Sequence, residues 1–187
     1  MPYECGVAQM EDLLMAKENK SEAFEWFDSI VFGLTVAMCV LVFFFNFSNV
    51  NGSSMFSTLS GGDRVLERGF LYTPQRGDIV TTDALISHGK PLAKRVIALE
   101  GDTVDISGGV VTVNGETLDE SYLKYSNITE PIDVEYPVVV PEGKVFLMGD
   151  NRENSLDSRA SEIGFIDTRD IQGKVIWRVA PNFGKVE

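Results

Sequence analysis

An uncharged, strongly apolar stretch near the N-terminus constrains this chain more than any other feature. No charged residue occurs in residues 29–62, and the central run over residues 30–45 reads IVFGLTVAMCVLVFFF. A helix of about 16–18 residues spans about 24–27 Å, close to the hydrocarbon thickness of a bilayer, and aromatic Trp26 and Phe47 can extend it into both interfaces. The run therefore predicts a single transmembrane helix over residues 29–47.

Two other kinds of apolar segment fit the run less well. The buried helix of a soluble core is disfavoured because the run has no polar face and is too long. A cleaved signal peptide needs a basic flank before the apolar run and small residues after it. Here Glu22, Glu25 and Asp28 precede the run, and Phe-Ser-Asn-Val-Asn ends it. We therefore expect a permanent membrane anchor.

The charge balance excludes one class of partner. The net charge is −12, and residues 1–28 already hold seven acids against two lysines. Neither this acidic tail nor the remainder has the basic patch that nucleic-acid binding requires. We expect no nucleic-acid partner. The tail is compatible with an amphipathic helix and equally with an irregular polar segment.

Charge alone does not orient the anchor. Lys17 and Lys20 precede it, whereas Arg64 and Arg68 follow it. The cytoplasmic flank of an anchor usually carries more Lys and Arg, but here the two flanks are equally basic, so this rule does not choose an orientation. The two cysteines are equally uninformative, because one lies in the tail and the other inside the apolar run, where they cannot plausibly pair.

The sequence pattern of residues 48–187 predicts a single domain that is mostly β. They are enough for a single core, and their apolar runs are short, β-branched and bounded by Gly, Pro or Asp. Asn114-Gly115 between two such runs is a strong hairpin signal. The pattern predicts antiparallel sheets in a sandwich or partial barrel, with an elaboration at about 107–143 and no amphipathic helix. The expected strands are 78–82, 92–99, 103–106, 110–113, 145–148 and 174–179.

A dense polar segment follows the predicted strand 145–148. Residues 149–159 read GDNRENSLDSR, with almost nothing apolar. An ordinary solvated turn uses Gly, Asp, Asn and Ser, so composition alone fits a turn as well as a functional loop. Its candidate functional residues are Asp150, Asn151, Ser155, Asp157, Ser158 and Arg159.

A serine in the segment GSSMFSTL (52–59) and Lys94 form a candidate catalytic pair. Lys94 lies in LAKRVIAL (92–99), where strand alternation puts either Lys94 or Arg95 on a face with apolar neighbours. A lysine can deprotonate a serine near neutral pH only if burial lowers its pKa from about 10.4 by about 2–3 units. The rival base is the only histidine, His88, which lies in a turn-like segment without apolar shielding. We expect no catalytic role for His88, no metal site and no cofactor, since no spacing for ligands or nucleotides is present.

Several segments in fixed order carry a resemblance to a known family. Taken together behind one anchor, they resemble the bacterial type I signal peptidases, the leader peptidase family of serine proteases with a Ser/Lys dyad. Eukaryotic relatives have His at the lysine position, so Lys94 indicates the bacterial kind. The segments are GSSMFSTL (52–59), GDRVL (62–66), RGDIV (76–80), KRVIALEGD (94–102) and the polar run 149–159.

The resemblance implies a site and a task. Ser54 is then the nucleophile, Lys94 the general base, and Ser155 the hydroxyl that orients the lysine. Asp157 and Arg159 hold the polar loop against the site, supported by Asp150, Asn151 and Ser158. Gly52, Ser53 and Met55 then contribute to substrate binding, although Met55 also fits a core position. The implied substrates are preproteins with signal peptides, and the implied topology has a cytoplasmic N-terminus, with the lipid bilayer as a second partner.

Three departures from the family pattern accompany the resemblance. Gly52 stands where some members have a serine that helps to bind the oxyanion, so this donor is missing. Ser57 replaces a usual proline, and Ala98 and Glu100 stand where the lysine segment usually has Gly and Pro. None of these changes removes a reacting group.

Two other functions remain compatible with these residues. One is a self-cleaving relative with the same dyad, which would require a DNA-binding domain. The other is an anchored binding module of the same fold without catalysis, which has no reason to keep both Ser54 and Lys94. The sequence determines neither the preferred precursors nor the oligomeric state.

Overall fold

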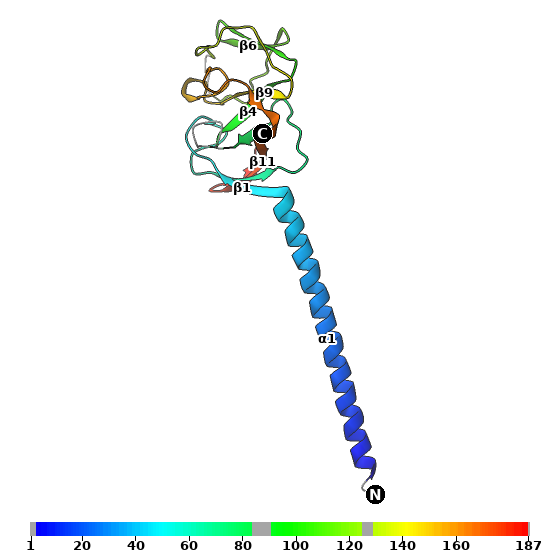
Figure 1. Ribbon diagram of the computed structural model, residues 1–187. Helices are drawn as coiled ribbons and strands as arrows, with labels where there is room; N and C mark the ends of the chain where they lie inside the picture. Colours follow the sequence, from blue (N-terminus) through cyan, green and yellow to red (C-terminus); the bar gives the residue numbers. More distant parts are fainter. Residues whose placement is uncertain (1–2, 84–90, 125–128, 187) are drawn as a thin grey trace. The chain divides into compact units, whose positions relative to one another are not determined.

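The chain forms two compact units, which divide after Phe43. The computed structural model describes residues 3–83, 91–124 and 129–186. The first unit is a single helix, and the second contains all the strands (Figure 1).

Helix α1 (Tyr3–Phe44) covers both the acidic tail and the apolar run. Its part from Phe24 to Phe44 has 21 residues and a mean hydropathy of 2.3, and none of it is buried in the protein. At 1.5 Å per residue this part is about 32 Å long, enough to cross a hydrocarbon core. An apolar helix exposed on every side is not the core helix of a soluble protein, because such a helix would be covered.

The predicted anchor is too long at its C-terminal end. The helix ends at Phe44, and residues 45–47 belong to strand β1 (Phe45–Asn49). β1 pairs antiparallel with β2 (Arg64–Arg68), with Phe45 opposite Arg68 and Phe47 opposite Leu66. Backbone pairing with β2 therefore overrides the hydrophobicity that suggested a continued helix.

The larger sheet is antiparallel throughout, and its strand order is β1-β2-β11-β3-β4-β9-β10, with β12 paired to β11. Register shifts in β11 and between β4 and β9 mark bulges, which bend strands and help the sheet to curl into a half-barrel. Each expected strand is present within a residue or a few residues of its predicted bounds. The remaining strands of this sheet are β3 (Ile79–Thr82), β4 (Ala93–Leu99), β9 (Lys144–Met148), β10 (Ile166–Asp167), β11 (Ile171–Ala180) and β12 (Gly184–Lys185).

A second, four-stranded sheet occupies most of the predicted elaboration. Its order is β7-β6-β5-β8, and it begins at β5, so the segment forms a separate layer instead of extending the first sheet. Asn114 and Gly115 both have positive φ, 56° and 81°, and form the expected two-residue turn between β6 and β7. The strands are β5 (Thr103–Ser107), β6 (Val110–Val113), β7 (Glu116–Thr117) and β8 (Val138–Val139).

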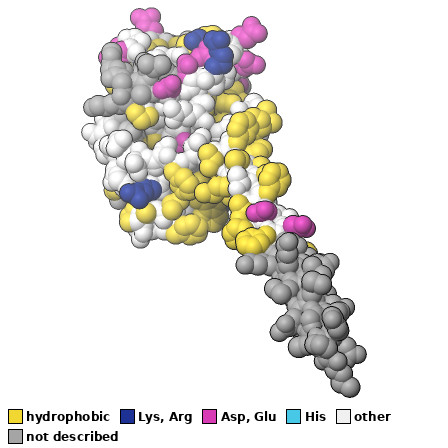
Figure 2. Space-filling view, turned by 60° about the horizontal axis from the view of Figure 1, so that its bottom comes forward, with side chains coloured by type: hydrophobic (Ala, Val, Ile, Leu, Met, Phe, Trp, Pro, Cys, Tyr) yellow, Lys and Arg dark blue, Asp and Glu magenta, His cyan; other side chains and the backbone are white. Residues whose placement is uncertain are grey.

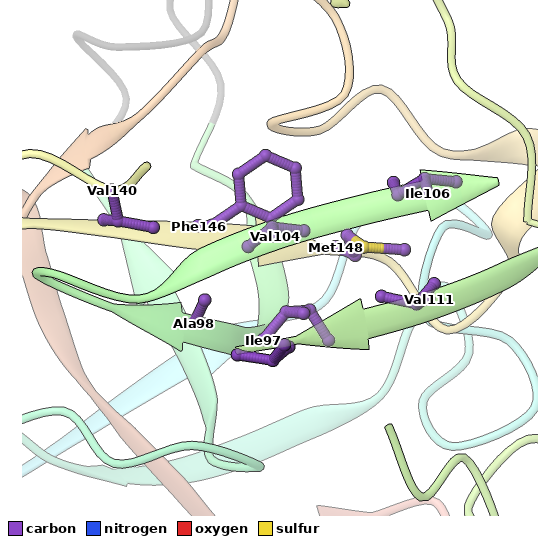
Figure 3. Packing of buried hydrophobic residues seen from close by; sticks show 9 residues of the cluster. Ile97, Ala98, Val104, Ile106, Val111, Val140, Phe146 and Met148 are labelled. Carbon is purple, nitrogen blue, oxygen red and sulfur yellow. The ribbon is translucent and has the colours of Figure 1, made fainter. Parts of the chain in front are cut away.

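The main hydrophobic core joins the two sheets. Side chains from β4 and β9 meet side chains from β5 and β6, as Figure 3 shows for Ile97, Phe146, Met148, Val104 and Val111. A second cluster includes Met55 and Leu59 from residues 54–59, here called the serine turn. In the described residues after Phe44, helical structure is limited to two short 3-10 turns, η1 (Arg152–Asn154) and η2 (Thr168–Asp170), in agreement with the expectation of a β domain.

Candidate active site

Ser54 lies on a tight turn that the core holds in place. The two apolar residues Met55 and Leu59 are buried in the cluster behind the turn. Within the turn, the N–H groups of Thr58 and Leu59 both donate to the carbonyl of Met55, each at 2.8 Å. This packing fixes the backbone of the turn and leaves the Ser54 side chain partly exposed.

Strand β4 brings Lys94 to this serine. Nζ of Lys94 lies 2.6 Å from Oγ of Ser54, which is hydrogen-bond distance. The lysine is only 2% exposed, because β4 is a central strand flanked by β3 and β9. The two candidate reacting groups, forty positions apart in sequence, are therefore in direct contact.

Burial brings the pKa of Lys94 closer to neutral pH. Loss of hydration destabilises the ammonium form and lowers the pKa of Lys94 from 10.5 to about 8, against the opposing attraction of the Asp157 carboxylate. The Asp150 carboxylate also favours the charged amine, whereas Arg159 opposes it. A substantial fraction of the amine is therefore neutral at pH 7–8.

The nearby carboxylates attract the lysine weakly because each already has an arginine. Asp157 receives Nε of Arg159 at 2.8 Å and its Nη2 at 3.0 Å. Asp150 receives Nε of Arg95 at 2.9 Å and its Nη2 at 2.7 Å. Both pairs are buried and two-pronged, the strong form of this interaction. Their opposite charges largely cancel at Lys94, so desolvation decides its pKa.

The polar loop after β9 closes over the serine turn. The N–H of Asn151 donates to the carbonyl of Ser54 at 2.9 Å, and its side-chain Nδ2 donates to the carbonyl of Ser53 at 3.1 Å. Gly149 makes this approach possible, since a Cβ there would lie 2.4 Å from the Ser54 carbonyl oxygen and 2.2 Å from Oγ of Ser155. The loop is a built part of the site and not a solvated turn.

The remaining predicted loop residues are buried, but they have different contacts. Ser158 donates its N–H to the carbonyl of Leu147 and accepts the N–H of Leu147 on its Oγ, both at 3.0 Å, so it ties the loop to β9. Asp157 accepts the N–H of Gly149 at 2.9 Å. Oγ of Ser155 is buried and has no hydrogen-bond partner among the described residues. The expected hydrogen bond from Ser155 to Lys94 is therefore absent from this structure.

The three residues expected to bind substrate do not share one surface. Gly52 and Ser53 are exposed, but Met55 is 1% exposed and belongs to the core. The Met55 side chain takes the core position that the sequence also allowed, because the turn directs it inward. Gly52 has a backbone φ of 85°, a conformation that residues with a side chain rarely adopt. This conformation accounts for glycine instead of serine at that position.

Two arginines of the site were not predicted from the sequence. Arg95 binds Asp150 and also stacks on Tyr122, with its Cζ 3.9 Å from the ring centre. Arg152 is buried and joins the loop to the elaboration through Thr129, Tyr122 and Glu120. The two consecutive basic residues in strand 92–99 were a signal for Arg95, since strand alternation buries at least one of them. The rival base His88 lies outside the described residues.

A small recess lies beside the serine turn. It has a volume of about 20 Å³ and is lined by two segments that precede the candidate reacting residues, one shortly before Ser54 and one directly before Lys94. A recess this small accepts a methyl group or hydroxyl but no large side chain. Its lining residues are Ser48, Asn49, Val50, Asn51, Val65, Thr81, Pro91, Leu92 and Ala93.

The fold and site define a class of enzyme before any comparison. A serine hydroxyl in contact with a buried amine, on a curled antiparallel sheet, is the equipment of a serine protease that uses lysine in place of histidine.

The chain belongs to the signal peptidase family, peptidase S26, whose model matches residues 23–180. It is similar to signal peptidase I from Bacillus licheniformis, with 36% identity over 168 residues that cover 83% of this chain and 87% of the relative. Signal peptidase I S from Bacillus subtilis is 35% identical over 172 residues, covering 85% and 91%. A crystal structure of a signal peptidase I from Enterococcus faecalis is 32% identical, with a TM-score of 0.46, and covers 56% of this chain and 97% of that one.

Family membership settles the coarse assignment. The protein is a serine protease, and its apolar helix together with its relatives indicates that it is anchored in a membrane.

Proposed function

We propose that this protein is a membrane-anchored endopeptidase that removes N-terminal signal peptides from exported preproteins, with Ser54 as nucleophile and Lys94 as general base. The observation that carries the proposal is the 2.6 Å contact between Oγ of Ser54 and Nζ of the buried Lys94. An intact pair also argues against a binding module without catalysis, because a buried lysine destabilises a fold that makes no use of it.

In the first step the neutral Lys94 amine accepts the proton of the Ser54 hydroxyl while Oγ attacks the carbonyl carbon of the scissile bond. The carbonyl oxygen becomes an oxyanion. As the C–N bond breaks, the Lys94 ammonium donates its proton to the leaving amine, which becomes the N-terminus of the mature protein.

The second step frees the enzyme. The signal peptide is now held as an ester on Ser54, and Lys94 is neutral again. Lys94 accepts a proton from a water molecule that attacks the ester carbon. As the C–Oγ bond breaks, the Lys94 ammonium donates this proton to Oγ, and the signal peptide leaves as a carboxylic acid that ionises in water.

The backbone N–H of Ser54 is our candidate for binding the oxyanion. Within the described residues this N–H donates no hydrogen bond, and it lies on the turn that Asn151 and Gly149 hold in place. A preorganised donor aimed at developing charge contributes more to the rate than a mobile one. No hydroxyl assists at position 52, so we expect this N–H to be the principal donor.

The recess of about 20 Å³ supports a preference for small side chains before the cut. The residues on its two sides, 48–51 and 91–93, are short extended segments. A substrate in extended conformation can align with such segments through its backbone and place alternate side chains in the recess. We expect small residues at the first and third positions before the cleaved bond.

An apolar strip on β1, β2 and β11 fits contact with lipid. Phe47 and Trp177 both lie opposite Leu66, so their side chains share one face, and Trp177 stacks on Phe183 at 5.0 Å between ring centres. Phe47 and Phe183 are each 73% exposed. Figure 2 shows hydrophobic side chains gathered on the lower part of the strand-rich unit and along the described helix. We propose that the N-terminus is cytoplasmic and the strand-rich unit lies outside, at the bilayer surface.

Processing of a reporter preprotein in detergent tests the proposal. Ser54→Ala and Lys94→Ala should each reduce processing below detection, because each removes a reacting group. Ser107→Ala and Lys144→Ala are the matched controls, since both lie outside the site, and they should process at the wild-type rate. Circular dichroism shows whether each variant is folded. Processing at an unchanged rate by a folded Ser54→Ala or Lys94→Ala variant would falsify the dyad.

A further inference from the structure

We infer that a basic groove beside the serine turn binds acidic side chains in the part of the substrate that follows the cleaved bond. The groove has a volume of about 650 Å³, and we call it the cationic groove. Ser57, Thr58, Tyr122, Lys124, Arg178 and Lys185 line most of it. The inference deepens the proposed function and rests on it.

The charge of this groove opposes the charge of the protein. The whole chain has 28 acidic and 16 basic residues. Among the described residues that line the cationic groove, three side chains are nevertheless basic and none is acidic. Lys124 and Lys185 are exposed. Such a local excess of positive charge in an acidic protein favours an anionic ligand and repels a basic one.

Arg178 is held in the groove wall at a fixed position. Its Nε donates to the carbonyl of Asn182 at 3.0 Å, and its Nη1 lies 3.3 Å from Oδ2 of Asp63. The Asp63 carboxylate is almost completely buried, so it compensates part of the arginine charge without presenting a carboxylate to the groove. Lys124 adds a second positive charge to the lining, from the same chain segment as Tyr122.

The recess and the groove adjoin the chain on the two sides of Ser54 in sequence. The recess for small side chains is lined by residues 48–51, which precede Ser54, whereas the groove is lined by Ser57 and Thr58, which follow it on the same turn. A substrate in extended conformation leaves the attacked carbon in opposite directions on its two sides. If residues before the cut occupy the recess, residues after the cut therefore pass toward the groove.

The groove is also joined to the catalytic network. Oγ1 of Thr58 donates to Oδ2 of Asp150 at 2.5 Å, and Tyr122 stacks under Arg95, which binds the same carboxylate. Both walls are thus fixed by residues that hold the site. A preformed groove binds a ligand with less loss of conformational freedom than a mobile one.

Cleavage of three preproteins that differ only at the second to fourth positions after the cut tests the inference. These positions carry Glu, Ser or Lys. For each exposed charge pair we expect an effect of about two- to five-fold, so wild-type kcat/KM should fall in the order Glu, Ser, Lys. The differences should shrink as salt rises, because the Debye length is only about 8 Å at 0.15 M.

Lys124→Glu should remove or reverse the preference, measured as the ratio of kcat/KM for the Glu and Lys preproteins. Lys144→Glu makes the same charge change outside the groove and should leave the preference intact. Equal cleavage of all three preproteins, or an unchanged preference in Lys124→Glu, overturns the inference.

Two further outcomes separate the alternatives. If wild type cleaves none of the three preproteins, the proposed function itself fails, and the groove is overturned with it. If Lys124→Glu slows all three equally in vesicles with anionic lipid but not in uncharged detergent, the groove binds lipid headgroups and the assignment to substrate is overturned.

Discussion

The protonation state of Lys94 governs the proposed reaction at the scale of a single residue. Because burial lowers its pKa to about 8, the ammonium predominates below pH 8 and cannot accept the serine proton. We expect kcat/KM to rise about tenfold per pH unit below pH 8 and to level off above it. Initial rates on a preprotein without ionisable residues near the cut, measured from pH 6 to 10, check this. A midpoint near the ordinary lysine value, or a flat profile, contradicts the role of the neutral amine.

Gly149 determines how closely the loop approaches the nucleophile. A methyl group at this position would overlap the Ser54 carbonyl oxygen, which is backbone and cannot turn aside. We expect Gly149→Ala to displace the serine turn and to lower kcat about 100-fold, the effect typical of a displacement of about 1 Å at a reacting group.

Gly184→Ala is the matched control for Gly149→Ala. No heavy atom lies within 4 Å of a Cβ built at Gly184, and its φ is not positive. This variant should keep wild-type kcat. Equal activity of the two variants would show that the loop does not constrain Ser54.

At the scale of elements, the loop after β9 depends on one buried ion pair. The Asp157 carboxylate forms an ion pair with Arg159 and accepts the N–H of Gly149. The side chains of Asp157 and Arg159 are both almost completely buried. Asp157→Asn leaves the arginine charge buried without its partner, which typically lowers the free energy of unfolding by about 3–5 kcal/mol. We expect a lower midpoint in urea unfolding, with loss of activity.

Asp167→Asn provides the comparison. Asp167 forms the same short-range pair with an arginine two positions on, but Arg169 is 88% exposed. Water replaces the lost partner there, so the unfolding midpoint should not change. An equal shift in both variants would mean that burial does not decide the contribution of these pairs.

Strands with a β-branched or apolar residue pattern could be predicted from the sequence. Strands that form only because they pair with distant strands could not. Runs such as 110–113 and 145–148 are β-branched or apolar and end at turn residues, and the structure contains both. β2 was missed because Arg64-Val-Leu-Glu-Arg is highly charged, and only its packing between β1 and β11 buries Glu67. β1 was missed because its first residues continue an apolar run. Pairing with distant strands decided both cases.

The site divides in a similar way. The contact between Ser54 and Lys94 was anticipated because two separate sequence segments resembled one family. The role of Arg152 was not anticipated, because its partners Thr129 and Tyr122 lie in a segment without a recognisable sequence pattern. For Met55 the sequence allowed both substrate binding and a core position, because sequence does not reveal which way a turn directs its side chains. The structure places this side chain in the core. Sequence thus indicated the contact between the two candidate reacting groups better than it indicated the residues that hold them.

At the scale of the whole molecule, the chain combines a catalytic unit with a separate apolar helix. The helix contributes no described side chain to the site, and the strand-rich unit has its own cores. Its proposed role is therefore to keep the enzyme in the same membrane as its substrates. Confinement of two partners to one surface raises their effective concentration without any new contact between them.

Removal of the helix tests this division of labour. A chain of residues 44–187 should cleave a short soluble peptide within about three-fold of the full-length rate, because the reacting groups are all retained. Its cleavage of a preprotein embedded in vesicles should fall about 100-fold or more, the scale on which tethering acts. Replacement of residues 24–43 by an unrelated apolar helix of equal length should restore it. If the truncated chain loses activity on both substrates equally while remaining folded, the helix supports catalysis directly. If it cleaves the embedded preprotein at the full rate, anchoring has no part in substrate encounter.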